Sequence, residues 1–329
     1  MVNLYPRRRF MKTAIAATSL AASTRAFPAA AYPNKPIHIV VGFAPGGGND
    51  LLARIVGQKL AVSLGQSVVV ENRPGAAGTI GANYVARAEP DGHTLLLGSV
   101  SNLVIGASTM AQVPFNVEKD FEPIILTAMT PLVLVVQSSL PANSIQELIA
   151  AAKAQPRKFT YATGGAGVAN DLAGALFNQM AGVEIRDVPY SGDSAGIVAL
   201  LAGQVTMMYS TLPTAVPHIE SGKLKALGVA LAKRATSMPD VPTIAESGLP
   251  GYEINLWNGV LTTGGVDQAI VQRLHDEIEK ILEMPDVRER VAKLGFERIT
   301  PSREAFANLI KADLQKYPPL VNKLGRRGK

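Results

Sequence analysis

The sequence contains no cysteine, and only four histidines and one tryptophan occur in 329 residues. Without cysteine the chain has no disulfide framework, no cysteine nucleophile and no thiolate metal site. The histidines, at positions 38, 93, 218 and 275, lie far apart in the sequence, so a metal site built from histidine is not expected. A composition of 47% hydrophobic and 18% charged residues excludes a disordered chain. The length favours roughly two domains.

Signatures of nucleotide binding and of catalysis are also missing. No Gly-Lys-Ser/Thr follows a glycine-rich loop, which excludes a phosphate-binding P-loop. The stretch Gly165–Gly167 lacks the third glycine of a dinucleotide fingerprint. None of the histidines has a convincing acidic partner, so no catalytic constellation is predicted.

Acidic residues are absent from residues 1–31, which contain five basic ones. The formal net charge of +6 therefore falls to +1 when this segment is removed, and four more basic residues lie in the last seven positions. The basic charge is thus concentrated at the two ends of the chain. It does not indicate a nucleic-acid-binding surface.

The N-terminal segment has the pattern of an export signal. Arg7-Arg8-Arg9-Phe10-Met11-Lys12 fits the twin-arginine pattern, and a short, mildly apolar stretch from Thr13 to Ser23 follows. Ala29-Ala30-Ala31 offers small residues to a signal peptidase, which predicts a mature chain beginning at Tyr32. Export by the twin-arginine route would place the protein in the periplasm.

Two uncharged stretches, Pro123–Gln146 and Ser194–Ile219, are long enough to be considered as membrane spans. Proline interrupts both of them, and Ser, Thr, Gln and Asn are scattered through them. We therefore expect them to form strands and helices of a globular protein.

Strand-like and helix-like segments alternate along the mature chain, which favours an α/β fold with parallel sheets. Ser144 and Glu147 form a capping-box pattern at the start of one helix. The expected strands are residues 37–41, 68–70, 94–97, 132–136, 159–163, 205–209 and 224–229. The expected helices are residues 51–60, 78–88, 144–153, 170–181, 194–201, 268–282, 286–294 and 302–316.

Three glycine-rich segments follow predicted strands: Phe43–Asp50, Asn72–Gly78 and Thr163–Asp171. Glycines after a strand let backbone N–H groups converge at a helix N-terminus, a geometry that favours anions. Ligands of open α/β sheets lie at the carboxyl ends of the strands. Two such loops at equivalent places in two domains predict a binding cleft.

These segments also carry a resemblance to a known family. Phe43–Arg54, Val70–Gly78, Ala88–Leu95 and Pro239–Thr243 resemble the corresponding motifs of the periplasmic solute receptors of tripartite tricarboxylate transporters, often called Bug proteins. The likeness covers nearly the whole mature chain. It implies a two-lobed periplasmic binding protein fold of type II, with parallel-sheet, Rossmann-like lobes joined by two crossing strands.

The resemblance also implies the domain boundaries and the site. The first lobe would comprise residues 32–131 and 232–329, and the second residues 132–231. A small carboxylate would bind between the lobes. The implied ligand-binding residues are Phe43, Pro45, Gly46, Gly47, Asn49, Asp50, Ser99, Ser101, Asn102, Thr163, Gly164, Gly165, Gly167, Asp171, Tyr190, Ser191, Asp193 and Ser210.

Some of these residues have a second interpretation. Asp50 is expected mainly to cap a helix start, because a carboxylate beside a bound carboxylate is repulsive. Asp171 and Asp193 depart from the family pattern, and they would either pair with an amine or hydroxyl of the ligand or disfavour a second carboxylate. Trp257 would either line the cleft or fill the core.

The function implied is a periplasmic receptor that delivers a small carboxylate to membrane permease subunits. The ligand would be a dicarboxylate, an amino acid or an aromatic acid. The receptor would be a monomer that needs no metal or cofactor, binds no nucleic acid and performs no catalysis. Two alternatives remain open: a sensor protein that docks on a signalling kinase, and an enzyme that acts on a small carboxylate.

Overall fold

The computed structural model describes residues 1, 32–299 and 301–326. The chain divides into a unit that ends at Tyr32 and a unit of residues Pro33–Lys329, and the fold described below is that of the second unit. The export signal expected in residues 1–31 lies, apart from Met1, outside the described residues.

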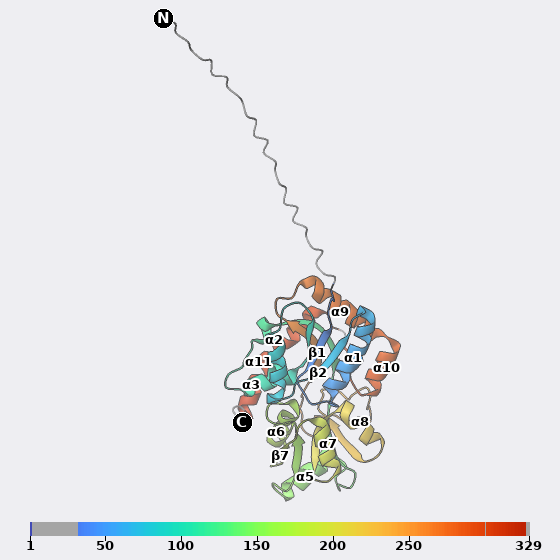
Figure 1. The fold of residues 1–329 in the computed structure, drawn as a ribbon. Helices are drawn as coiled ribbons and strands as arrows, with labels where there is room; N and C mark the ends of the chain where they lie inside the picture. Colours follow the sequence, from blue (N-terminus) through green and yellow to red (C-terminus); the bar gives the residue numbers. More distant parts are fainter. Residues whose placement is uncertain (2–31, 300, 327–329) are drawn as a thin grey trace. The chain divides into compact units, whose positions relative to one another are not determined.

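Two five-stranded sheets organise the fold. The first has the strand order β2-β1-β3-β10-β4 and the second has the order β7-β6-β8-β5-β9. Figure 1 shows the green and yellow elements of the second sheet grouped apart from the blue and red elements around the first. The strands are β1 (Ile37–Val41), β2 (Val68–Asn72), β3 (Thr94–Ser99), β4 (Phe121–Met129), β5 (Leu132–Gln137), β6 (Thr160–Thr163), β7 (Arg186–Pro189), β8 (Met207–Thr211), β9 (Leu224–Val229) and β10 (Trp257–Thr263).

Both sheets are mixed, whereas the alternating pattern predicted parallel ones. In the first sheet β1 pairs in parallel with β2 and β3, but β10 runs antiparallel to both β3 and β4. In the second sheet β6 pairs in parallel with β7 and β8, and β5 runs antiparallel to β8 and β9. Each sheet thus has a parallel Rossmann-like part and an antiparallel part. The strands before and after the two connections between the sheets, β4 with β5 and β9 with β10, all lie in the antiparallel parts.

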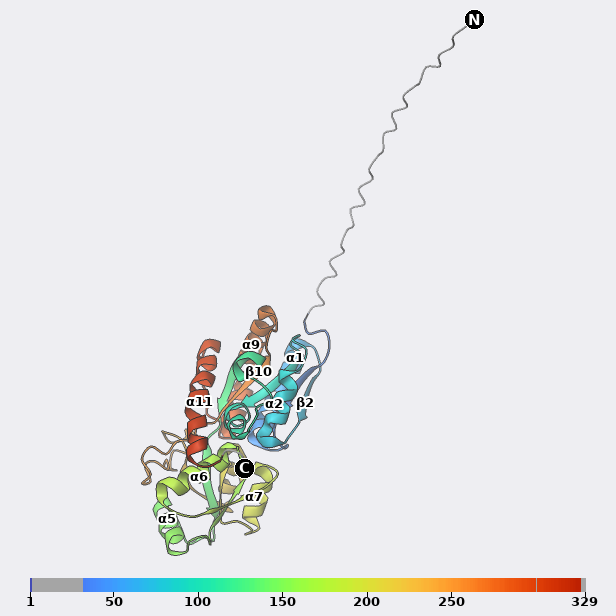
Figure 2. The same ribbon diagram turned by 90° about the vertical axis from the view of Figure 1, so that its left-hand side faces the viewer.

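Helices cover both sheets. Helices α1 and α9 pack against each other, and α11 packs on β4 and on the turn that follows β3. Around the second sheet, α6 and α7 contact β6 and β8, and α8 contacts β9. In Figure 2 the long α11 lies on one side of the first-sheet region and α1, α2 and β2 lie on the other. The helices are α1 (Gly48–Leu64), η1 (Ala76–Gly78), α2 (Thr79–Ala86), η2 (Ser101–Ile105), α3 (Gly106–Thr109), α4 (Val117–Asp120), α5 (Ile145–Ala154), α6 (Ala169–Ala181), α7 (Asp193–Leu201), α8 (Leu212–Glu220), α9 (Gln268–Glu283), α10 (Pro285–Lys293) and α11 (Arg303–Lys323).

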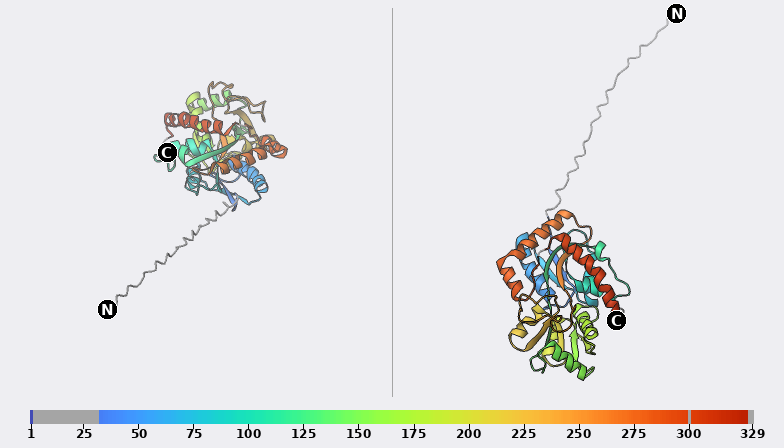
Figure 3. Two further views of the ribbon diagram at one scale, coloured as in Figure 1. Left: turned by 90° about the horizontal axis from the view of Figure 1, so that it is seen from above. Right: turned by 180° about the vertical axis from the view of Figure 1, so that it is seen from behind.

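The chain passes between the sheets at two neighbouring places. Thr130 and Pro131 connect β4 to β5, and residues 230–256 lead from β9 back to β10. The Thr130 N–H donates to the carbonyl of Leu256 at 2.7 Å, and the Ala230 N–H donates to the carbonyl of Leu132 at 2.8 Å. These bonds hold the two connections side by side. The view from behind in Figure 3 shows the blue and red elements around the first sheet grouped apart from the green and yellow elements of the second.

Most of the predicted elements are present. The expected strand over residues 224–229 coincides with β9, and the capping box forms at the start of α5. There the Glu147 N–H donates to Ser144 Oγ at 3.1 Å, and the Glu147 carboxylate accepts the N–H of Asn143 at 2.7 Å. Strand β8 begins two residues later than predicted, at Met207.

The differences have local causes. Strand β7 is a polar edge strand, so it shows no apolar run. Strand β4 contains Pro123 but lies at the sheet edge, where a missing N–H is tolerated. Helix α11 continues past its predicted end through Pro318 and Pro319 to Lys323. Strand β10 carries polar residues yet is buried throughout, because it lies inside the sheet.

The single tryptophan belongs to the core. Trp257 in β10 is fully buried, its indole N–H donates to Asp313 at 2.7 Å, and its ring packs edge-on against Phe306 at 5.3 Å. Of its two expected roles, the structure therefore supports the core role. No helix among the described residues is long and apolar enough to cross a membrane.

Candidate functional site

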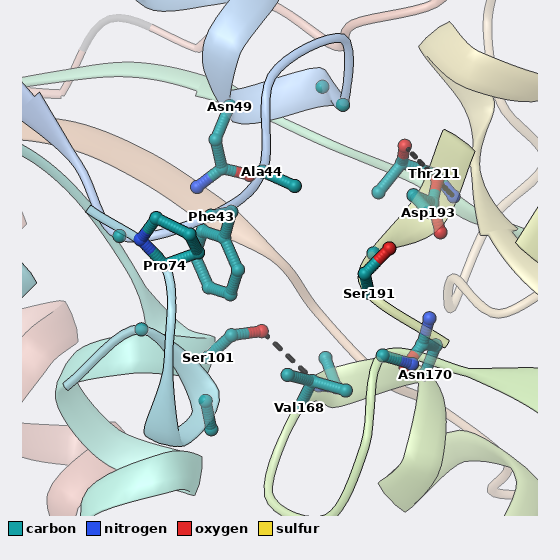
Figure 4. Close-up of a pocket in the computed structure, with 18 of the residues that line it drawn as sticks. Phe43, Ala44, Asn49, Pro74, Ser101, Val168, Asn170, Ser191, Asp193 and Thr211 are labelled. Atoms are coloured by element: carbon teal, nitrogen blue, oxygen red, sulfur yellow. Dashed lines mark hydrogen bonds between the residues drawn. The ribbon is translucent and has the colours of Figure 1, made fainter. Parts of the chain in front are cut away.

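A cleft of about 420 Å³ opens between the strand-end loops of the two sheets. Figure 4 shows Asn49, Phe43 and Pro74 on one wall, and Asp193 and Ser191 on the opposite wall. The described residues that line it are Gly42, Phe43, Ala44, Gly47, Gly48, Asn49, Pro74, Gly75, Ala76, Ala77, Gly78, Ser101, Leu132, Gly164, Val168, Ala169, Asn170, Tyr190, Ser191, Gly192, Asp193, Thr211 and Leu256.

The structure separates the predicted site residues into two groups. Those that line the cleft are Phe43, Gly47, Asn49, Ser101, Gly164, Tyr190, Ser191 and Asp193. Those that are not among the lining residues are Pro45, Gly46, Asp50, Ser99, Asn102, Thr163, Gly165, Gly167, Asp171 and Ser210, of which Pro45 and Gly46 are exposed.

The first loop connects β1 to α1. Gly47 precedes the helix in an extended conformation, and no side chain caps the helix start. The side chain of Asn49 points into the cleft, and its buried Nδ2 has no hydrogen-bond partner among the described residues (Figure 4). A buried amide donor without a partner is costly. Asn49 is therefore suited to donate to a ligand.

The second glycine-rich loop, Asn72–Gly78, contains no residue that was predicted to bind the ligand. Its residues Gly75, Ala76, Ala77 and Gly78 all have positive φ, at 129°, 46°, 55° and 86°. For alanine this left-handed conformation costs about 1 kcal/mol or more, and such strain gathers at functional sites. All four residues line the cleft. The Pro-Gly-Ala-Ala-Gly sequence between a strand and a helix was the signal that pointed to them.

Asp50 and Asn72 hold these two loops together. Asp50 is buried and accepts hydrogen bonds from the Gly46 N–H at 2.9 Å, from Arg54 Nε at 3.0 Å and from Asn72 Nδ2 at 2.9 Å. Asn72 Nδ2 also donates to the Phe43 carbonyl at 3.1 Å. Burial alone would raise the pKa of Asp50, but these hydrogen bonds and the Arg54 charge lower it below its usual value. Asp50 thus has a structural role, but it joins the two loops and does not cap the helix start as expected.

The residues after β3 contribute one side chain to the cleft. Ser101 lines it, and Ser101 Oγ accepts the N–H of Ala169 at 3.2 Å, which joins the two walls (Figure 4). Ser99 is turned inward, and its N–H and hydroxyl donate to Asn102 Oδ1 at 2.8 and 3.2 Å. Ser99 and Asn102 therefore support the turn.

On the second wall the loop after β6 folds on itself. Thr163 Oγ1 accepts the Gly165 N–H at 2.8 Å, and Asn170 Oδ1 accepts the Gly164 N–H at 3.1 Å. A side chain at Gly167 would place its Cβ 2.7 Å from Thr109 Oγ1, so this glycine permits a close contact between the lobes. Val168, Ala169 and Asn170 line the cleft although the sequence analysis did not select them.

Asp193 closes the far end of this wall. Its Oδ2 accepts the Thr211 N–H at 2.9 Å, the Thr211 hydroxyl at 2.7 Å and the Ser210 hydroxyl at 3.0 Å. Burial raises the pKa of Asp193 above its usual value although these hydrogen bonds oppose the shift. Ser210 thus helps to position the Asp193 carboxylate and is not itself part of the cleft lining. Thr211 itself lines the cleft and was not predicted.

Asp171 lies behind the wall, in α6. Its Oδ1 is 3.2 Å from Nη2 of Arg326, which follows the C-terminal end of α11. Both side chains are less than 10% exposed. The carboxylate is thus paired by an arginine from the opposite lobe.

Residues 192–196 match the Gly-x-Ser-x-Gly pattern of a nucleophile elbow, so an expectation that the sequence contains no such motif is wrong. In the structure Ser194 belongs to the first turn of α7 and is not part of the cleft lining. No histidine is among the described residues that line the cleft. No histidine of the described lining is therefore placed in the cleft as a base for this motif.

Helix N-termini surround the cleft. The N-cap residues of α1, α2, α6, α7 and α8 all line it, and no side chain caps any of these five helices. Each N-terminus carries a partial positive charge. No lysine, arginine or histidine is among the described lining residues, and no group of residues in the described part could hold a metal ion. Backbone dipoles are thus the source of positive potential here, and they suit a small anion.

A family model decides the classification. Residues 52–326 match the model described as "Tripartite tricarboxylate transporter family receptor". The chain belongs to this family. A curated relative from Pseudomonas sp. (strain P51), described as a UPF0065 protein in the tcbD-tcbE intergenic region, is 39% identical over 98% of this chain and 95% of its own length.

Solved structures agree with this classification. Rpa4515 of R. palustris, solved with adipate, is 32% identical with a TM-score of 0.86, over 89% of this chain and 98% of its own. The periplasmic binding protein BugD is 34% identical with a TM-score of 0.85, over 90% and 99%. MatC from Rhodopseudomonas palustris, solved with malate, is 31% identical with a TM-score of 0.83, over 88% and 100%. The family resemblance and the two-lobed fold predicted from the sequence are confirmed.

Proposed function

We propose that this chain is a periplasmic receptor that captures a small organic carboxylate in the cleft and delivers it to the membrane permease of a tripartite tricarboxylate transporter. The observation that carries the proposal is the set of five uncapped helix N-termini around a cleft without a basic side chain. A carboxylate held there by N–H and amide donors needs no arginine. The adipate and malate of the two R. palustris structures support this ligand class.

Binding would couple the two lobes, which we assign to residues 32–131 with 232–329 and to residues 132–231. Loops from both lobes line the cleft, so a ligand that contacts both walls stabilises the closed arrangement over the open one. The receptor works as a monomer without metal, cofactor or covalent chemistry.

The test of this function is a thermal-shift screen of the protein from Tyr32 onward against small mono-, di- and tricarboxylates, amino acids and aromatic acids. Binding to the folded state raises stability by about 2.7 kcal/mol at a ligand concentration of 100 Kd. We expect a concentration-dependent rise in Tm for at least one class of acid. No rise with any acid at millimolar concentration would refute the proposal, and turnover of a bound acid would favour the enzyme alternative.

Export and delivery need tests in cells. Replacing Arg7 and Arg8 by lysine is expected to keep the protein in the cytoplasm, because the twin-arginine route reads that pair. Deleting the gene is expected to abolish uptake of the acid identified in the screen. Unchanged uptake, with loss of a transcriptional response to the same acid, would instead favour the sensor alternative.

A further inference from the structure

We propose that Asp193 selects the ligand: the acid that binds carries a hydrogen-bond donor, a hydroxyl or protonated amine, at the end away from its bound carboxylate, and lacks a second carboxylate there. This inference rests on the proposed function and narrows its ligand class. It comes from the different surroundings of the acidic residues around the cleft.

Three helices that point at the cleft have an aspartate in their first turn: Asp50 in α1, Asp171 in α6 and Asp193 in α7. Asp50 forms an ion pair with Arg54 at 2.9 Å, and Asp171 forms one with Arg326 at 3.2 Å. Neither of these carboxylates lines the cleft. Their charges are thus compensated behind the walls and do not face a ligand.

Asp193 differs on both counts. It lines the cleft, and it forms no ion pair within the described residues. Its hydrogen-bond donors, Thr211 and Ser210, are neutral and converge on Oδ2. They fix the position of the carboxyl group and bring no positive charge to it. A carboxylate held in this way in a desolvated site favours a ligand donor as an additional partner.

The opposite wall supplies the site for the ligand's own carboxylate. Asn49 Nδ2 is buried there without a partner among the described residues, beside the N-terminus of α1 and the strained loop of residues 75–78. Figure 4 places Asn49 and Asp193 across the cleft from each other. Between these polar ends the lining is largely apolar, with the side chains of Phe43, Ala44, Pro74, Leu132, Val168 and Leu256.

The side chains of this arrangement are asymmetric, although uncapped helix N-termini lie on both walls. The Asn49 amide is a donor at one end, the Asp193 carboxylate is an acceptor at the other, and hydrocarbon lies between. A dicarboxylate would bring its second negative charge toward Asp193, with no basic side chain among the described lining residues to separate the two. The second carboxylate of the ligand and the Asp193 carboxylate would repel each other, and this repulsion is stronger when solvent is excluded from the cleft. An ω-hydroxy or ω-amino acid would have a hydrogen-bond partner at each end, Asn49 for its carboxylate and Asp193 for its hydroxyl or amine.

The test compares acids that differ only at the far end. For chain lengths of three to eight carbons, the dicarboxylate, the ω-hydroxy acid, the ω-amino acid and the unsubstituted acid are titrated into the mature protein by calorimetry. At six carbons the set is adipate, 6-hydroxyhexanoate, 6-aminohexanoate and hexanoate, and 4-hydroxybenzoate with terephthalate forms an aromatic pair. At the best length the hydroxy or amino acid is expected to bind at least about tenfold more tightly than the dicarboxylate.

Two variants link the preference to the residue. Asp193→Asn, and Asp193→Ser as a smaller alternative, are expected to improve binding of the dicarboxylate and weaken binding of the amino acid, so that the order changes. Asp240→Asn is the matched control, since Asp240 is exposed and outside the cleft lining. This variant is expected to bind the acids of the series in the same order of affinity as the wild type.

Several outcomes overturn the inference while leaving the receptor intact. The inference is contradicted if the wild type binds the dicarboxylate more tightly than the hydroxy and amino acids. It is also contradicted if both Asp193 variants keep the wild-type order of affinities. Binding of other carboxylates with no member of the matched series bound also contradicts it. The absence of binding by any carboxylate at all refutes the proposed function itself, so the two failures are distinguishable.

Discussion

The guanidinium of Arg326, which follows α11, packs against the second lobe, where it is 3.2 Å from Asp171 and donates to the Tyr161 hydroxyl at 2.8 Å. Helix α11, which precedes it, packs on the first sheet through β4. Helix α11 and Arg326 therefore connect the two lobes at a place outside the cleft lining. Asp171, an expected ligand residue, already has this structural partner.

Replacing Arg326 by methionine is expected to lower the free energy of unfolding by about 3 kcal/mol, because it leaves a buried carboxylate without its cation. The double variant Arg326→Met with Asp171→Asn should recover much of that loss. Denaturant unfolding of the mature protein measures both, with Lys323→Met, an exposed neighbour, as the control. An Arg326→Met protein as stable as the wild type would show that the pair contributes nothing.

Asp50 predicts a pH dependence of stability. Its pKa in the folded protein is lowered, so its contribution is present above the usual Asp pKa and is lost as the pH falls through the lower, folded value. Asp50→Asn should therefore lower Tm at pH 7, and the difference from the wild type should shrink in strong acid. Melting curves from pH 7 to pH 3 measure this, with Asp240→Asn as the control. A difference independent of pH would contradict the ionic role.

The strained loop predicts a stabilising glycine. Ala77→Gly is expected to raise the free energy of unfolding by about 1 kcal/mol, since Ala77 has a φ of 55° that glycine adopts without strain. Ala150→Gly, at an exposed position within α5, is the matched control and should destabilise by about 1 kcal/mol. If both variants lose stability equally, the backbone at Ala77 is not strained.

The core position of Trp257 predicts a fluorescence result. Because the indole is fully buried and outside the cleft lining, acrylamide should quench it poorly, and a bound acid should leave its emission wavelength unchanged. Asp313→Asn should alter the emission, since the indole N–H donates to that carboxylate at 2.7 Å. Strong protection from quenching that appears only with ligand would instead place the indole at the cleft.

The sequence was informative where a pattern is local. Apolar runs, helix periodicity and the capping box at Ser144 predicted most strands and helices, and the glycine-rich loops predicted which strand ends meet at the cleft. Strands β4, β7 and β10 were missed because their pairing depends on the sheet. Pro123 in β4 and the polar residues of β7 are tolerated at sheet edges, and no local pattern shows where an edge lies.

The sequence predicted which loops form the cleft, but it predicted less well what the individual side chains of these loops do. Asp171 and Asp193 look alike in sequence, each in the first turn of a helix after a strand-end loop. Only the fold brings Arg326, 155 positions further along the chain, to Asp171 and leaves Asp193 with neutral donors. The glycine-rich sequence marked the loop that contains Ala76 and Ala77, but their left-handed conformation could not be predicted, because alanine rarely adopts positive φ.

The most direct test of the central claim is calorimetric titration of the mature protein with the best acid from the screen and with its primary amide. The two ligands have nearly the same shape, but the amide carries no charge. If the helix N-termini and Asn49 hold a carboxylate, the acid should bind about a hundredfold more tightly than the amide. Equal affinities for the acid and the amide would contradict carboxylate recognition in this cleft.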